Sequence, residues 1–445
     1  MKKSACILVV LLSFVQVQLL RAQDTLYVDL ETALKIALSE SPVIRIADRE
    51  VVRALYARKE TQSGLWPKIS ASGVYNRTLK KQVMVFDFGG TPTEISVGTD
   101  NNWMGGVTLS LPLVAPALWK TVQLSALDID LAVEKARSGR LAMVSAVKQA
   151  YYSLLLAKDS YVVLKKNYDN VALNTKTVTD KYAQGMASEF EKLRAEVALK
   201  NQRPNLLASE TAIELAAMQL KALMGLDIEY PVVFAGSLIQ YEGEVTTVGL
   251  SSTNGFSLEK NTDLMQLDIQ KQQMELAMKI AKASFLPTLS LSSNYQYSSM
   301  NNDFRFSNYN WYPYSTASLA LSIPLFNGLK RQQQIRQSKL SLETLDDSRV
   351  NSERTLRLNV SNCLNQMSNA VESLSSNKEN VSMAEKAYSI SCKQYEVGMG
   401  TWLDLSASEL ALTQARLAYH QSVYNYLFYR AELEKITGTS NYQNQ

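Results

Sequence analysis

Lys181-Tyr182-Ala183-Gln184-Gly185-Met186 is followed 213 residues later, from 181 to 394, by the similar stretch Gln394-Tyr395-Glu396-Val397-Gly398-Met399. Each stretch ends a long segment that contains no proline. A glycine can reverse the chain at such a place because it accepts positive φ. The two stretches therefore predict two equivalent turns, each joining a long helix to a return helix, and they indicate an internal duplication.

Four further pairs of matched stretches occur in the same order in both halves. They are 41–44 with 261–264, 65–70 with 285–290, 108–113 with 320–325, and 220–225 with 433–438. The separation is 220 residues for the first two pairs and 212 or 213 for the others. The first half therefore carries a longer loop between its second and third matched stretches. We predict two structural repeats, residues 23–257 and 258–445.

The composition excludes several classes of protein. Among 445 residues, 46 basic side chains face 42 acidic ones, and no basic block of the kind that binds nucleic acid stands out. One histidine and three cysteines leave few ligands for a metal site. No phosphate-binding loop, nucleophile elbow or dinucleotide motif occurs. We therefore expect no enzyme, no cofactor, no metal and no nucleic-acid partner.

Residues 1–22 have the features of a secretory signal peptide. Lys2 and Lys3 precede an apolar run from Ala5 to Leu20, and the small residue Ala22 follows. A membrane anchor is the alternative, but the run is short for a bilayer span. No later apolar run reaches the roughly 18 residues of a spanning helix, so we expect none after the signal.

Helices dominate both predicted repeats. Ser41 followed by Pro42 predicts a helix that runs to about Ser63, and its equivalent is expected at about 258–284. A long helix follows at about 116–180, and tip turns at 181–188 and 394–401 lead into return helices at about 188–224 and 402–437. Pro204 should kink or break the first return helix. Segment 225–257 and the C-terminal tail complete the repeats, and we expect 225–257 to wrap the middle of the assembly.

The long helices carry a seven-residue apolar period, which is typical of left-handed coiled coils. In the first repeat the period is formed by Val147, Tyr151, Leu154, Tyr161, Tyr168 and Tyr182. In the second repeat the same register gives Val360, Leu364, Met367, Leu374, Val381 and Tyr395.

Between helices, each repeat contains two segments that alternate between apolar and small polar residues. They predict β-hairpins at about 67–113 and 287–325. The pattern fits strands between lipid and a polar lumen, and it also fits half-buried strands of a soluble sheet. The signal peptide and the loop aromatics Trp103, Trp311, Tyr312, Tyr314 and Phe86 favour the barrel. Four strands cannot close a barrel, so several chains must contribute: two would give eight strands and three would give 12.

These stretches in this order resemble the TolC-like outer-membrane efflux proteins, over about Leu30 to Gly438. The resemblance implies a mainly α chain whose long antiparallel coiled-coil helices form a periplasmic α-barrel. It also implies four strands per chain in a 12-stranded barrel of a homotrimer, placed in outer-membrane lipid. The implied partners are a periplasmic adaptor protein and an inner-membrane transporter of the resistance-nodulation-division or ABC type.

The resemblance also suggests which residues act at the tips. Members carry acidic residues after the turn that narrow the pore, and Asp404 and Glu191 lie six residues after Gly398 and Gly185. A second acid expected three residues after Asp404 is Ala407 here. An acidic ring would attract cations and resist closer approach of the chains. The alternative is that both acids are solvated residues that favour a helix N-terminus.

Five residues are candidates for adaptor docking at the tips: Tyr182, Gly185, Tyr395, Gly398 and Trp402. For the glycines the alternative is plain helix capping, and for the tyrosines it is packing between helices. Trp402 would be a partner anchor if it were exposed, and core packing is its alternative.

We expect a passive exit duct of a tripartite pump that carries small molecules from the periplasm to the exterior. The exit duct of a type I protein secretion system is an alternative within the same class. An exported coiled-coil structural or adhesive protein is an alternative from another class, but it would need no lipid-facing strands. A porin without partners would need no helices about 100 Å long.

Overall fold

The computed structural model describes residues 26–87, 89–90, 92–247 and 256–439. The predicted signal peptide, 1–22, lies outside them. Contacts divide the chain into two compact units. The first comprises Met1–Asp48, Lys135–Met265 and Ser352–Gln445, and the second comprises Arg49–Glu134 and Gln266–Asn351. Each unit therefore contains parts of both halves of the sequence.

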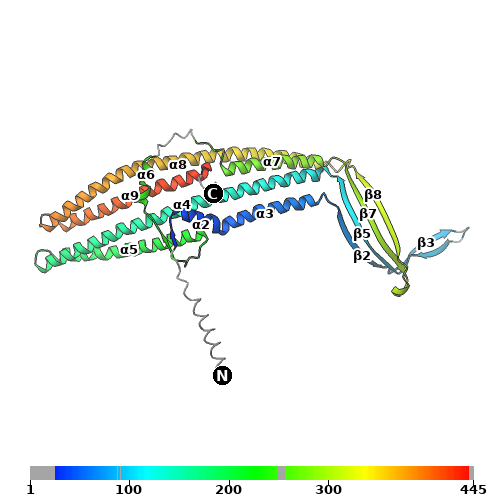
Figure 1. The fold of residues 1–445 in the computed structure, drawn as a ribbon, viewed down its shortest axis with the longest axis horizontal. Coiled ribbons are helices and arrows are strands. Elements are labelled where there is room, and N and C mark those ends of the chain that lie inside the picture. Colours follow the sequence, from blue (N-terminus) through cyan, green and yellow to red (C-terminus); the bar gives the residue numbers. More distant parts are fainter. Residues whose placement is uncertain (1–25, 88, 91, 248–255, 440–445) are drawn as a thin grey trace, which may run out of the picture. The chain divides into compact units, whose positions relative to one another are not determined.

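The second unit holds a four-stranded antiparallel sheet in the order β2-β5-β7-β8 (Figure 1). Its strands are β2 (Lys68–Arg77), β5 (Asn101–Val114), β7 (Thr288–Asn301) and β8 (Tyr312–Ser322). The central pair, β5 with β7, joins the two halves of the sequence. β8 ends at Ser322, so the predicted alternation through Leu325 extends beyond the strand.

One face of this sheet is apolar across all four strands. Ile69 lies opposite Leu109, while Leu291 lies between Leu111 and Leu319. Side chains paired in this way share a face of the sheet. Ile69 and Leu319 are 70% and 66% exposed, so this chain leaves much of its own apolar face uncovered.

The opposite face of the sheet is polar. The Thr108 hydroxyl donates to Asn294 Oδ1 over 3.3 Å, and the hydroxyl oxygens of Ser292 and Ser318 lie 3.1 Å apart. Successive residues of a strand point to opposite faces. The alternation predicted from sequence is thus a separation of apolar and polar faces.

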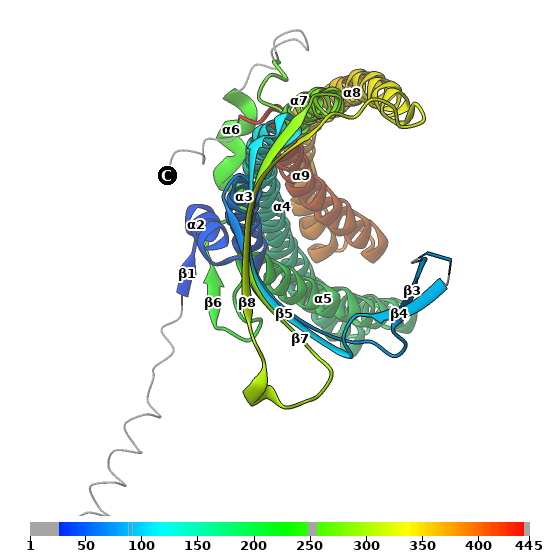
Figure 2. The same ribbon diagram turned by 90° about the vertical axis from the view of Figure 1, so that its right-hand side faces the viewer.

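The longer loop of the first half contains a hairpin of its own, β3 (Gln82–Asp87) with β4 (Pro92–Val97). These strands pair with each other and with no strand of the four-stranded sheet. The hairpin projects beyond one end of that sheet (Figures 1 and 2). The matching loop of the second half holds only the 3-10 helix Phe306–Asn308, which explains the change in separation between the matched stretches.

Two helical hairpins form most of the first unit. The first pairs α4 (Pro116–Ala183) with α5 (Glu189–Met224), and the second pairs α8 (Lys330–Glu396) with α9 (Trp402–Thr437) (Figure 1). Two helices of intermediate length, α3 (Pro42–Ser63) and α7 (Thr262–Ala283), belong mostly to the second unit. α7 starts four residues later than predicted, and α5 is not broken at Pro204. None of the described helices combines the length and apolar character needed to span a bilayer.

The predicted seven-residue seam is buried over its central part. Val147 and Leu154 are fully buried on α4, and Val360, Leu364 and Met367 are buried on α8. They join residues of α9 such as Val423 and Tyr426 in one large core cluster. Toward the tips the seam is less covered in the first half than in the second, where Leu374 and Tyr395 are buried.

A helix missed by the sequence reasoning precedes α3. This helix, α2 (Leu30–Glu40), is capped by Asp29, whose carboxylate accepts from the Thr32 N–H over 2.9 Å. Its buried Ala33, Leu34 and Ala37 have helical spacing, which could have revealed it. β1 (Leu26–Val28) pairs in parallel with β6 (Val232–Phe234) beside α2 (Figure 2).

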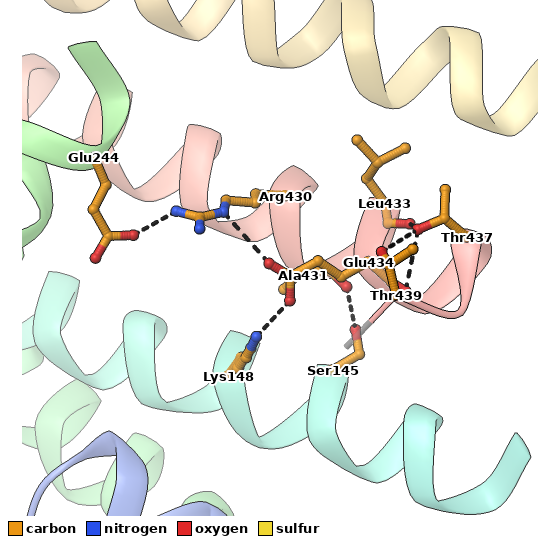
Figure 3. Close-up of polar contacts among 9 residues, drawn as sticks. All are labelled: Ser145, Lys148, Glu244, Arg430, Ala431, Leu433, Glu434, Thr437 and Thr439. Carbon is orange, nitrogen blue, oxygen red and sulfur yellow. Dashed lines mark hydrogen bonds and ion pairs between the residues drawn. The ribbon is translucent and has the colours of Figure 1, made fainter. Parts of the chain in front are cut away.

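Ion pairs connect the long helices to the described part of segment 225–257, which we predicted to wrap the middle of the assembly. It contains the 3-10 helix η1 (Leu238–Tyr241) and α6 (Glu242–Thr247). Arg430 of α9 bonds Glu244 of α6 and also pairs with Glu434 over 3.4 Å (Figure 3). Glu434 in turn pairs with Lys148 of α4 over 2.5 Å. These four side chains alternate in charge and connect α6, α9 and α4.

Each return helix ends at a glycine that packs on the start of its own half. Gly225 and Gly438 adopt φ of 74° and 67°. A Cβ on Gly225 would lie 2.9 Å from the Glu40 carbonyl oxygen, and one on Gly438 would lie 2.3 Å from that of Lys260. The Asn261 amide also donates to the Ile436 carbonyl over 2.8 Å. The first and last matched stretches of each half are therefore in contact.

We expect Gly438→Ala to lower the free energy of unfolding by more than about 1 kcal/mol, because alanine resists positive φ and its Cβ would overlap the Lys260 backbone. Thermal unfolding of the purified protein measures the change. Gly139→Ala is the control, because this helical glycine has open space at Cβ and should be neutral or stabilised. Equal melting temperatures for Gly438→Ala and the unmodified chain would contradict the role of this contact.

Candidate functional site

The two tip turns have the same backbone geometry, as their sequence similarity predicts. Gly185 and Gly398 adopt φ of 73° and 79°. The glycine N–H groups donate to the carbonyl oxygens of Tyr182 and Tyr395, over 3.0 and 3.3 Å. The next residue in each turn, a methionine, donates to the carbonyl five residues before it. These bonds satisfy the last carbonyls of α4 and α8 and reverse the chain.

Both predicted pore acids cap the return helices. Ser188 Oγ accepts from the Glu191 N–H over 3.2 Å, while the Glu191 carboxylate accepts from the Ser188 N–H. Thr401 and Asp404 repeat this capping box on α9, and the Thr401 hydroxyl also donates to Asp404 Oδ2 over 2.6 Å. Glu191 is half-buried and Asp404 is exposed. Both acids therefore stabilise the N-terminus of a return helix, as the alternative interpretation has it. Asp404 is also exposed to solvent.

The two tip tyrosines have different surroundings. Tyr395 is 6% exposed, whereas Tyr182 is 38% exposed. Lys181 donates from Nζ to the Tyr395 carbonyl over 2.5 Å and lies 4.2 Å from the centre of its ring. Lys192 lies over the Tyr182 ring at 5.1 Å. Only Tyr395 therefore packs between helices.

Trp402 is buried rather than exposed. It belongs to a small apolar cluster that draws residues from all four long helices. The members are Val178 of α4, Ala195 of α5, Tyr395 of α8, and Trp402 and Leu405 of α9. This tip cluster holds the two hairpins together near their turns. The condition under which Trp402 would be an exposed anchor is not met in this chain.

Other apolar side chains are exposed at the turns. Met186 and Phe190 are each 66% exposed at the first turn, and Val397 and Met399 are 70% and 83% exposed at the second. They are not among the tip residues predicted from the sequence. For Met186, Val397 and Met399 the available signal was their position directly beside the turn glycines, because a tight reversal leaves few neighbours around its outer side chains. Phe190 lies further on, at the start of α5.

His420, the one histidine of the chain, is a packed residue of α9. Its Nδ1 lies 3.6 Å from Asp159 Oδ2, which also accepts from the Ser237 hydroxyl and the Leu238 N–H. Burial lowers the pKa of His420, and Asp159 partly opposes this. In the part of the chain that the structure describes, no group of three or more metal-binding side chains comes together.

Comparison with known proteins gives one family match that covers most of the chain. The family of outer membrane efflux proteins matches residues 33–226 and 256–439. These two segments correspond to the two halves of the sequence. They contain all seven tip residues singled out above.

A curated relative is the pyoverdine export outer membrane protein OpmQ of Pseudomonas aeruginosa. It is 22% identical over 302 residues, which are 67% of this chain and 61% of OpmQ. The chain thus spans about three fifths of that relative's length.

Two solved structures have the same fold. The CmeC outer membrane channel of Campylobacter jejuni matches with a TM-score of 0.74 and 19% identity, over 92% of this chain and 85% of CmeC. The MtrE outer membrane channel of Neisseria gonorrhoeae, solved in its open state, matches with a TM-score of 0.72 and 15% identity, over 92% of this chain and 88% of MtrE.

We expect Thr401→Ala to weaken the first turn of α9 by about 1 kcal/mol, the usual cost of losing an N-cap. Faster hydrogen exchange of the Asp404 and Leu405 amides would report the loss. Thr401→Ser keeps the hydroxyl and should restore slow exchange. Exchange that is equally slow in Thr401→Ala would mean that the capping box does not stabilise the turn.

Proposed function

Since the chain belongs to the outer membrane efflux protein family, we propose that three copies form a passive exit channel of a tripartite pump. The channel would carry small molecules from the periplasm to the exterior. The family places the protein in the outer membrane and among transport proteins rather than enzymes. OpmQ is named for export of pyoverdine, which supports a small-molecule cargo.

The observation that carries the proposal is the separation of faces in the four-stranded sheet. Its apolar face, with Ile69, Leu319 and Leu321 each more than 60% exposed, suits the hydrocarbon of a bilayer. Its polar face, with Thr108 and Asn294, suits a water-filled lumen. In a soluble coiled-coil protein this uncovered apolar face would be exposed to water, which is unfavourable.

The sheet also supports a trimer. β2 and β8 each have one edge that pairs with no other strand among the described residues. Unpaired backbone groups are not tolerated in hydrocarbon, so these edges must pair with other copies. Three copies give 12 strands, which leave room for a pore, whereas eight strands are filled by side chains.

We assign the tips two roles in this channel. Asp404, and Glu191 with it, would narrow the pore by bringing negative charge from three copies close together. Ala407 stands in place of the second acid, so the charge ring would be weaker than in relatives that have both.

The second role is docking. The turns at Gly185 and Gly398, beside Tyr182 and Tyr395, would contact a periplasmic adaptor that connects to an inner-membrane transporter of the resistance-nodulation-division or ABC type. Trp402 would support that surface from inside.

We expect Leu319→Lys to prevent insertion into the outer membrane, because a lysine on the lipid face costs up to about 2–4 kcal/mol near the bilayer midplane. Ser318→Lys is the matched control, because the neighbouring residue faces the proposed lumen. Membrane fractionation of cells expressing each variant provides the measurement. If both variants insert equally, the assignment of the apolar face to lipid is wrong.

We expect single-channel conductance in planar bilayers to rise when Glu191→Ala and Asp404→Ala are combined. Alanine replaces each carboxylate side chain by a methyl group, so the pore becomes wider at its narrowest point only if those acids line it. Small uniform steps in the unmodified protein and larger steps in the double variant support the constriction. Steps of unchanged size would place the narrowest point elsewhere in the channel.

A further inference from the structure

A small cavity lies next to the tip cluster, between α4, α5 and α9. Its volume is about 100 Å³. Most of its polar lining is uncharged, and Trp402 and Leu405 of the tip cluster also line it. The polar lining residues are Asn167, Asn174, Thr175, Gln202, Ser406 and Glu409.

Glu409 is the only acidic residue of that lining, and it is 5% exposed. Its Oε2 accepts a hydrogen bond from the Asn174 amide over 3.2 Å. Its Oε1 is buried, and no described residue forms a hydrogen bond with it. A carboxylate in such a place lacks the charge partner that normally makes burial tolerable.

The groups that face Glu409 are polar but uncharged. α4 presents the amides of Asn170 and Asn174, and α8 presents the phenol of Tyr388 and the thiol of Cys392. α5 presents Gln202 to the cavity. Among the described residues no lysine or arginine acts on the carboxyl. Burial therefore dominates and raises the pKa of Glu409 to about 7, against a smaller opposite effect of the amides and the phenol.

We propose that Glu409 is a proton-dependent latch of the tip: protonated, it keeps α9 packed against α4 and α5, and ionised, it draws water into the cavity and loosens the tip cluster. The link to the turn is direct, because Trp402 and Leu405 belong both to the cavity wall and to the cluster. Glu409 is buried within a single chain, so the latch does not depend on a neighbouring copy. Its effect on transport rests on the proposed channel function.

The direction of the pH effect follows from the two states. When the tip is loosened and Glu409 meets water, its pKa returns toward the ordinary value near 4.5. Between about pH 4.5 and 7 the packed tip therefore binds a proton that the loosened tip releases. Raising the pH through this window favours the loosened tip, and the effect levels off above about 7. The ratio of loosened to packed tips changes by at most about tenfold per pH unit for each Glu409.

Hydrogen exchange of residues 402–412, corrected for intrinsic rates, tests the latch in the purified full-length protein at pH 5.5 and 7.5. The unmodified chain should exchange more slowly at pH 5.5. Glu409→Gln should remain slow at both values, because glutamine copies the neutral form. Glu379→Gln, which changes an exposed glutamate of α8, should behave like the unmodified chain. A pH response that persists in Glu409→Gln would overturn the proposal.

A second variant keeps the test decisive if Glu409→Gln fails to fold. Asn174→Ala removes the hydrogen bond that favours the ionised carboxylate, so it should move the midpoint of the response to higher pH. A midpoint that is unchanged or lower would contradict the latch.

Conductance in planar bilayers distinguishes failure of the latch proposal from failure of the channel proposal. The open fraction of the unmodified protein should rise from pH 5.5 to 7.5, and that of Glu409→Gln should stay low. If conductance steps occur but Glu409→Gln retains the pH response, the latch is wrong and the channel stands. If no variant conducts while the exchange response depends on Glu409, the channel proposal is wrong and the latch stands.

Discussion

The antiparallel pairing of β5 with β7 joins strands from the two halves of the sequence into one sheet. Thr108 and Asn294 are partners in this pair although 186 residues separate them, from 108 to 294. The register brings Leu111 opposite Leu291 and so aligns the apolar residues of both halves on one face. A shift of one residue would put half of them on the polar face. The sheet can present one face to lipid and the other to a water-filled lumen only in this register.

The two strands of this pair come from different halves of the sequence. Each half supplies one pair of strands and one helical hairpin. In each half the glycine that ends the return helix, Gly225 or Gly438, packs against the backbone just before the first matched stretch of that half. The two halves are similar in backbone but not in side-chain detail. At the tips Tyr395 is buried with Trp402, while Tyr182 is exposed, so the second hairpin contributes more to the tip cluster. We infer that the polar cavity at Glu409 makes this shared tip cluster sensitive to protons.

Features with a strong local or periodic cause were predictable from sequence. The tip turns need a residue that accepts positive φ, and the glycines at 185 and 398 mark them. The seam follows from burial on one side of a helix, and the strand alternation follows because successive side chains of a strand point to opposite faces. Features that depend on long-range packing were not predictable. Whether Trp402 is exposed depends on Val178 and Ala195 of another hairpin. α5 continues through Pro204, although proline normally interrupts a helix. α2 was missed because its short apolar pattern stood next to the stronger Ser41–Pro42 signal.

We propose that three copies of this chain complete one channel, because among the described residues its sheet has two unpaired edges and an uncovered apolar face. The most direct measurement is the protein mass of the detergent-solubilised particle by native mass spectrometry. A trimeric channel should give the mass of three processed chains, with no smaller stable species. A particle of one or two chains that stays intact in detergent would contradict it, because its sheet could not close around a pore.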